Sequence, residues 1–248
     1  MVAGGAGVND FARAFGYLND PLNWQGPDGI LALLREHVAI SAVAVLLALV
    51  VALPVGVVLG HFDRGSGFVV ALSNVSRAIP TLALLTVFAV TPIGFGDTAT
   101  TIALAVFAVP PILTNTFVGF REVDADVREA ARAMGMGGGQ VVLRAELPLA
   151  LPLVMTGIRT ATVQVVATAS LAALVGGGGL GQLINLGFGQ QDYGLMIAGA
   201  ILVAVLALLT ELVLVVLTWA VTPGPRRLAF RPLRARTRPA AQVSGVPL

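Results

Sequence analysis

The sequence predicts an all-α membrane protein, a polytopic bundle of about five transmembrane helices. Hydrophobic residues make up 56% of its 248 residues and charged residues only 11%, with a mean hydropathy of +0.90. Soluble domains of this length are much more polar. Five apolar runs are long enough to cross about 30 Å of hydrocarbon as helices. One charged island, residues 119–148, separates the third run from the fourth.

Residues 1–33 are expected to precede the bundle without spanning the membrane. They are mixed in character, with three aspartates, two prolines and several aromatic residues. Aromatic side chains at such a place can rest at the level of the lipid headgroups. The first span then covers residues 38–60, and its polar end begins at His61, which we interpret as an interfacial loop residue.

The second span, residues 68–90, contains Asn74 and Arg77. Both residues are costly in lipid, so we expect them to face protein or water and consider them candidate pathway residues. Pro80 in the same run lacks an amide donor and predicts a kink or break near mid-depth.

The third span, residues 98–118, follows a short turn rich in Gly and Pro. Pro110 and Pro111 inside this span remove two backbone donors, so we expect the regular hydrogen-bond ladder to break there. Asn115 follows them and is another candidate pathway residue.

The fourth span, residues 149–175, carries a long polar stripe that includes Arg159 and Gln164. Such a stripe is expected to line a pathway or a helix interface, where its members contact either a substrate or a neighbouring helix.

Residues 176–181 formally fit the G-x-G-x-x-G dinucleotide pattern, but no strand precedes them and the next acidic residue comes too early. We interpret them as a turn with closely packed backbone.

The last span, residues 194–221, contains Glu211. This carboxylate is expected to pair with Arg77 or Arg159, or to lie near the membrane interface, and the sequence does not choose between these places.

Residues 221–248 are basic and broken by prolines. We expect them to lie against anionic lipid without a stable fold rather than to bind nucleic acid.

The charged island predicts a short amphipathic helix. Asp126 and Glu129 have the spacing of a capping box, and Gly135 stands where a left-handed residue ends a helix. A second short helix is expected at about residues 140–147, with Pro148 at the start of the next apolar run. Such an element is too polar to span a membrane, and it suits a membrane surface that meets a soluble partner.

Six residues of the island recur at a fixed spacing: Glu129, Ala130, Ala131, Gly135, Leu147 and Pro148. This pattern resembles the signature loop of the permease subunits of bacterial ABC importers, with Ala145 where that family usually has Ile. The resemblance covers roughly residues 34–220. It implies the type I ABC importer permease fold, and it implies that residues 119–148 form the loop that couples the membrane helices to an ATPase. In that loop the small side chains of Ala130 and Ala131 are expected to supply the docking face.

Residues 77–84, 111–116 and 176–181 carry a finer resemblance. Together they are similar to the permeases for glycine betaine, carnitine, choline and related osmoprotectants, which implies import of a small quaternary amine. A permease for an amino acid such as methionine is the nearest alternative. A self-sufficient secondary transporter is a more distant one, because we find no inverted repeat.

The resemblance also implies an assembly of cytoplasmic ATPase subunits, an external substrate-binding protein and a second permease subunit, identical or paralogous. This chain has neither Lys nor Cys. The first absence excludes a P-loop and the second excludes Cys-based zinc sites. We therefore expect no catalytic residue, metal or cofactor in this chain, with ATP and Mg²⁺ on the ATPase.

The distribution of arginine predicts the orientation in the bacterial cytoplasmic membrane. The charged island, the turn at Arg64 and the C-terminal tail carry nearly all the loop arginines, whereas residues 91–97 and 176–193 carry none. Because positively charged loops stay in the cytoplasm, we expect the N-terminus outside and the C-terminus inside.

Overall fold

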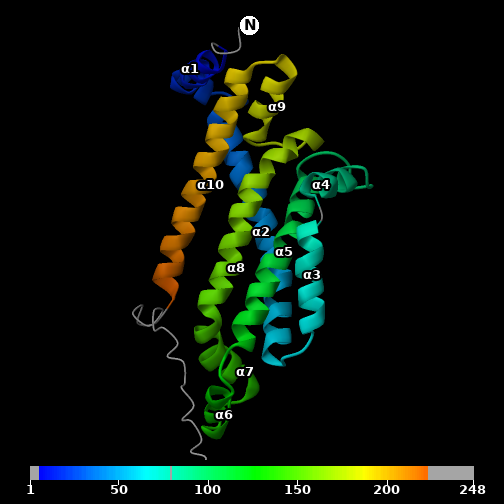
Figure 1. Cartoon of the computed structure of the whole chain (residues 1–248), viewed down its shortest axis with the longest axis vertical. Helices are drawn as coiled ribbons and strands as arrows, with labels where there is room; N and C mark the ends of the chain where they lie inside the picture. The colour runs from blue at the N-terminus through cyan, green and yellow to red at the C-terminus, as the bar shows by residue number, and fades with distance from the viewer. Residues whose placement is uncertain (1–5, 79, 223–248) are drawn as a thin grey trace, which may run out of the picture.

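The computed structural model describes residues 6–78 and 80–222, apart from the side chains of residues 6–8 and 77. Within these ranges the regular structure is helical throughout. The long helices run side by side along one axis, and short helices close both ends (Figure 1). The elements are α1 (Ala6–Asn19), η1 (Pro21–Trp24), α2 (Ile30–His61), α3 (Ser66–Ala78), α4 (Thr81–Ala89), α5 (Asp97–Arg121), α6 (Ala125–Ala133), α7 (Gly138–Gln140), η2 (Val141–Glu146), α8 (Leu147–Thr168), η3 (Ala169–Val175), α9 (Gly181–Gln190) and α10 (Tyr193–Val221).

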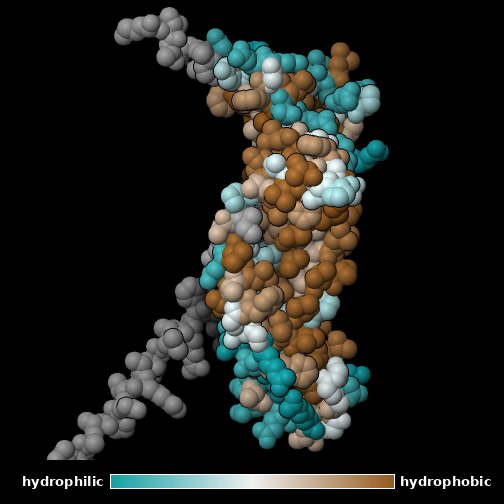
Figure 2. Space-filling view, turned by 90° about the vertical axis from the view of Figure 1, so that its right-hand side faces the viewer, coloured by the Kyte–Doolittle hydropathy of each residue, from teal (hydrophilic) through white to brown (hydrophobic). Residues whose placement is uncertain are grey.

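Within the described residues, four stretches of helix are long and apolar enough to cross a membrane: α2, α5, the run Gly138–Val175 and α10. A fifth span results if residues 66–76 and Thr81–Ala89 count as one bent pair, whose halves differ in direction by 88°. Figure 2 shows an apolar band across the middle of the visible face of the bundle, with hydrophilic residues at both ends. The prediction of an all-α bundle with about five spans is confirmed.

The prolines behave differently in the second and third spans. Pro80 stands between α3 and α4, where the chain bends sharply, as expected. α5 instead continues as one helix through Pro110 and Pro111, although neither residue can donate a hydrogen bond to the preceding turn. Pro110 is buried, as are Ile112 and Leu113, which follow the two prolines. Packing by the neighbouring helices holds α5 together although two backbone donors are missing.

The first span is longer than predicted. α2 begins at Ile30 rather than at residue 38, so its first turns include polar residues such as His37. The His37 side chain is buried, and its Nε2 lies 2.9 Å from the carbonyl oxygen of Val166 in α8. Because such polar side chains are paired inside the bundle, they do not end the helix.

The contact between α2 and α5 forms the centre of the bundle. Small residues recur at every fourth position along the buried face of α2: Ala44, Ala48, Ala52, Gly56 and Gly60. A Cβ at Gly60 would lie 2.7 Å from the carbonyl oxygen of Phe117, so the two backbones approach closely. Close approach of small residues drives helix association in lipid, where no hydrophobic effect pulls apolar helices together.

α10 lies at the edge of the bundle (Figure 1). Its first turns pack among α1, α8 and α9 and bury Leu195, Ala198 and Val203. Farther along, it exposes large apolar side chains such as Leu208 and Leu212. This length of α10 is therefore available to lipid or to another membrane subunit.

Candidate functional site

The predicted amphipathic helix is present as α6, beyond the ends of the long helices at one end of the bundle (Figure 1). Its N-cap is Asp124, whose side chain accepts a hydrogen bond from the amide of Asp126 at 3.0 Å. The expected capping box of Asp126 with Glu129 is therefore wrong, because the helix begins before Asp126. Gly135 follows the helix with a φ of +83°, which confirms its predicted left-handed conformation.

α6 has one face against its own chain and another face exposed. Ala131 is only 2% exposed, whereas Glu129 and Ala130 are exposed. Val127 and Met134 are exposed as well, although both are apolar. The expectation that Ala131 supplies part of a docking face is corrected, because this side chain points into the protein. The exposed ridge of α6 consists of Val127, Ala130 and Met134. These residues are three and then four positions apart, so they lie on the same side of the helix.

The signature loop leads directly into a membrane-spanning helix. The short helix expected at residues 140–147 is found as α7 and η2, a π-helical turn that continues into α8. Leu147 and Pro148 are the first residues of α8. Pro148 cannot donate to the preceding turn, and this turn is the one that widens to the π form.

A buried ionic cluster lies behind α6. Glu146 of η2 has no exposed side-chain surface, and its two oxygens have different partners. Nδ1 of His61, at the end of α2, lies 2.7 Å from one oxygen, and Nε of Arg128, in α6, lies 2.7 Å from the other. The contact between Arg128 and Glu146 is an ion pair, because the Nε–H of Arg128 does not point at Oε1 of Glu146 well enough for a hydrogen bond. Arg128 also donates from Nη2 to the carbonyl oxygen of Phe120 in α5.

Sequence reasoning missed this cluster. His61 was interpreted as an interfacial loop residue, but it is the last residue of α2 and its side chain is 11% exposed. Arg128 and Glu146 lie directly beside signature residues, which could have drawn attention to them. Their pairing depends on how the helices cross, and no local pattern contains that information.

A cavity of about 470 Å³ lies between α3, the start of α4, α5 and α8. Two of the predicted pathway residues, Asn115 and Gln164, line it together. The hydroxyl groups of Ser76 and Thr160 and the ring of Phe107 belong to the same lining. None of the described lining residues is ionisable, and together they offer dipoles and an aromatic ring.

Residues 30–222 match the family of the binding-protein-dependent transport system inner membrane component. The chain belongs to this family. One relative is the choline transport system permease protein OpuBB of Bacillus subtilis (strain 168), 39% identical over 194 residues, which cover 78% of this chain and 89% of the relative. Another is the carnitine transport permease protein OpuCB of Listeria monocytogenes, 39% identical over 194 residues, which cover 78% and 88%.

The fold agrees with this membership. An inward-facing structure of the MetNI methionine ABC transporter matches with a TM-score of 0.67 and 27% identity, over 78% of this chain and 96% of the other. The predicted type I ABC importer permease fold is confirmed. The protein is thus a multi-pass inner-membrane permease subunit.

Among the described side chains, the remaining predicted pathway residues of this permease do not line the cavity. Asn74 is exposed on α3, and the side chain of Arg77 lies outside the described part of the chain. Arg159 of α8 forms an ion pair with Glu211 of α10. This contact selects one of the alternatives considered for Glu211, and it joins the second half of α10 to the bundle.

The glycine-rich turn, residues 176–181, lies toward the end of the permease opposite α6 and is held by two carboxylates. Oδ1 of Asp97 accepts a hydrogen bond from the amide of Gly178 at 2.8 Å, and Oε2 of Glu36 accepts one from the amide of Gly179 at 2.7 Å. A Cβ at Gly178 would overlap the Glu36 carboxylate. The interpretation as a closely packed turn is confirmed, whereas the role of the two carboxylates was not foreseen.

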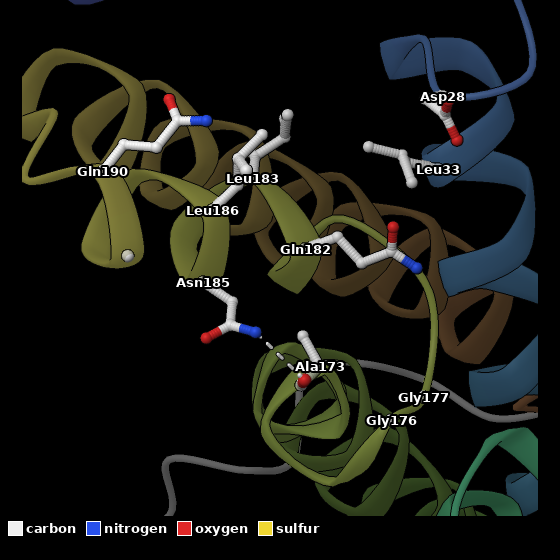
Figure 3. A pocket seen from close by; sticks show the side chains of 11 residues that line it. Asp28, Leu33, Ala173, Gly176, Gly177, Gln182, Leu183, Asn185, Leu186 and Gln190 are labelled. Carbon is white, nitrogen blue, oxygen red and sulfur yellow. Dashed lines mark hydrogen bonds between the residues drawn. The ribbon is translucent and has the colours of Figure 1, made fainter.

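An open pocket of about 760 Å³ lies beside this turn, between the start of α2, η3 and α9 (Figure 3). Asp28, Gln182 and Gln190 contribute polar side chains to it. Asn185, in the same lining, donates from Nδ2 to the carbonyl oxygen of Ala173 at 3.3 Å. The permease therefore has a polar recess at the end that carries α1 and α9 (Figure 1).

Proposed function

We propose that this chain is the membrane subunit of an ATP-driven importer for a small quaternary-ammonium osmolyte such as choline, carnitine or glycine betaine. The relatives named for choline and carnitine transport support this substrate class. So does a permease of Bacillus subtilis (strain 168) named for glycine betaine, carnitine and choline together, 38% identical over 188 residues. In the structure, the cavity between α3, α5 and α8, whose described lining residues are uncharged, carries the proposal.

This cavity suits a cation that cannot donate hydrogen bonds. A quaternary ammonium group spreads its charge over methyl groups, so hydroxyl and amide oxygens and the ring of Phe107 can contact it without a paired carboxylate. Weak contacts of this kind favour passage, because a solute held tightly inside the membrane leaves slowly. We therefore place the selective aromatic cage in the external binding protein.

The exposed ridge of α6, Val127, Ala130 and Met134, is the proposed contact with a cytoplasmic ATPase subunit. Apolar side chains exposed beside charged ones are typical of a surface that a partner covers. Glu129 adjoins the ridge and offers a charge to the partner. ATP and Mg²⁺ belong to that ATPase, since this chain has no Lys for a P-loop. A second permease subunit, identical or paralogous, completes the pathway.

The proposed orientation places α6 in the cytoplasm. Among the described residues, the end of the bundle with α6 carries Arg64, Arg121, Arg128, Arg132 and Arg144. The opposite end carries Arg13 and Arg35. By the positive-inside rule the N-terminus then lies outside and the C-terminus in the cytoplasm. The 760 Å³ recess faces outward in this orientation and is available to the binding protein.

The substrate is tested by uptake into proteoliposomes that hold the permease with its ATPase and binding protein. We expect ATP-dependent uptake of labelled choline, carnitine or glycine betaine and no uptake of labelled methionine. A complex whose ATPase cannot hydrolyse ATP is the control. Transport of methionine instead would favour the amino-acid alternative. Uptake that persists in the control and follows an ion gradient would favour a secondary transporter.

A further inference from the structure

The buried cluster of His61, Glu146 and Arg128 favours one orientation of α6. Glu146 is fully buried, and the side chains of Arg128 and His61 are only 16% and 11% exposed. A carboxylate removed from water needs partners, and loss of one partner leaves an unpaired charge in the interior. The cluster is therefore satisfied only while α6 brings Arg128 to Glu146.

Arg128 connects α6 with three other helical elements. Its guanidinium contacts Glu146 in η2 and also the carbonyl oxygen of Phe120 in α5. A planar group with several donors suits two acceptors at once. From Glu146 the contacts continue to His61 at the end of α2. One side chain of α6 is thereby tied to the cytoplasmic ends of α2 and α5 and, through η2, to α8.

The covalent connection from α6 to α8 is less rigid. It runs through residues 135–139, and a Cβ at any of the glycines there would meet nothing within 4 Å. A glycine-rich segment without neighbours bends readily, so it passes little of a rigid-body movement to the helix that follows. The contacts of the cluster are better placed to carry such a movement.

We propose that Arg128, Glu146 and His61 are positioning residues that form a joint, through which α6 moves together with the membrane helices. This inference rests on the proposed function, in which α6 docks onto an ATPase subunit. The three residues act through α6 and not on the solute. Their loss uncouples ATP hydrolysis from the permease without removing the docking surface.

The test uses the complete complex in proteoliposomes. Glu146→Gln keeps the side-chain volume and removes the charge, and Arg128→Gln removes the guanidinium. For both variants we expect normal co-purification of the ATPase and basal hydrolysis within about twofold of the wild type. Stimulation of hydrolysis by loaded binding protein is expected to fall about tenfold, a usual size for coupling between sites.

Asp63→Asn is the matched control. Asp63 and Arg121 form an ion pair of 2.7 Å that joins the ends of α2 and α5 at the same end of the bundle. Their side chains are 58% and 50% exposed, and neither belongs to α6. This variant is expected to keep wild-type stimulation, because exposed ion pairs contribute little.

Arg128→Lys separates positioning from general stability. A lysine keeps the charge but not the fork that reaches both acceptors, so we expect stimulation between those of the wild type and Arg128→Gln. A merely structural role would lower the amount of complex recovered and leave stimulation per complex unchanged.

Spin labels give an independent measurement. The chain has no Cys, so cysteines introduced at the exposed positions Arg64 and Ala133 can be labelled without background. We expect a narrow distance distribution between α6 and the end of α2 in the wild type and in Asp63→Asn. The distribution is expected to be broad in Glu146→Gln and Arg128→Gln.

The proposed joint would be overturned if both Gln variants kept wild-type stimulation of ATP hydrolysis. It would also be overturned if Asp63→Asn lost as much stimulation as the Gln variants. If Glu146→Gln does not assemble, Arg128→Lys decides, and unchanged stimulation in that variant rejects the proposal. If the wild-type permease neither binds an ATPase nor responds to a binding protein, the proposed function is contradicted instead. The spin-label distances then still decide whether the cluster holds α6 in place.

Discussion

Two glycine-rich segments at opposite ends of the bundle need glycine for different reasons. At Gly177, Gly178 and Gly181 there is no room for a side chain, since a Cβ at Gly177 would lie 2.7 Å from the hydroxyl oxygen of Thr100. Gly176 and Gly179 of the same segment have a positive φ. At residues 135–139 there is ample room, and only Gly135 adopts a conformation that other residues avoid. The first segment is limited by space as well as by backbone geometry, and the second by backbone geometry alone.

The difference indicates what each segment is for. The turn at 176–181 is enclosed by α2, α5 and η3 and held by Glu36 and Asp97, so it fixes these helices relative to each other at that end of the bundle. In the proposed orientation this turn is the outer turn, and residues 135–139 are the inner segment. The segment at 135–139 has space around it and leaves α6 accessible to a partner. Glycine is thus part of a rigid turn at one end of the bundle and of an accessible segment at the other.

The comparison requires the two segments to lie on opposite sides of the membrane. A reporter that is active only outside the cytoplasm is expected to be active when fused after Gly181 and silent when fused after Arg144 or Arg238. Activity per amount of fusion protein in the membrane is the measurement. Activity after Arg144 would reverse the orientation and remove the argument for ATPase docking.

Gly181→Ala tests the lack of space in the outer turn. The new Cβ would overlap the carbonyl oxygen of Ser170, a backbone atom that cannot turn aside. We expect the free energy of unfolding to fall by about 3 kcal/mol. Thermal unfolding in detergent, followed by the fluorescence of the two tryptophans, measures the change.

Gly189→Ala is the control for the outer turn. Gly189 lies in α9, close along the chain to the turn, but a Cβ there would meet nothing within 4 Å. We expect this variant to be as stable as the wild type or up to about 1 kcal/mol more stable, because alanine favours helix. Equal stability of the two variants would show that the outer turn has more room than the structure gives it.

Gly135→Val tests the conformational requirement in the inner segment. A β-branched residue at a φ of +83° is expected to cost about 1 to 2 kcal/mol. The variant is expected to reach the membrane in normal amount but to lose transport, because the chain leaves α6 in a changed direction. Uptake and co-purification of the ATPase are the measurements.

Gly137→Val is the control for the inner segment. Gly137 is equally open but has a φ of −69°, which valine adopts without strain. Normal uptake is expected in this variant. If Gly135→Val also transported normally, the loop would not couple the ATPase to the membrane helices.

Sequence reasoning succeeded where the deciding contacts are local. The left-handed Gly135 and the bend at Pro80 depend on one or two turns of chain, and both predictions are confirmed. At Pro110 and Pro111 it indicated the two missing backbone donors but not that burial among neighbouring helices keeps α5 intact. It failed for Ala131, because the spacing of the signature does not tell which face of α6 lies against its own chain.

By itself, the sequence determined that this protein is an all-α membrane permease of about five spans with a charged loop between the third and fourth. Hydropathy and motif spacing are properties of short segments, so they can be recognised in the sequence without knowledge of the fold. Only the tertiary structure decided which polar groups meet. Glu146 finds His61 and Arg128 across large separations in the chain, because buried charges must be paired and only helix crossing brings their partners within reach.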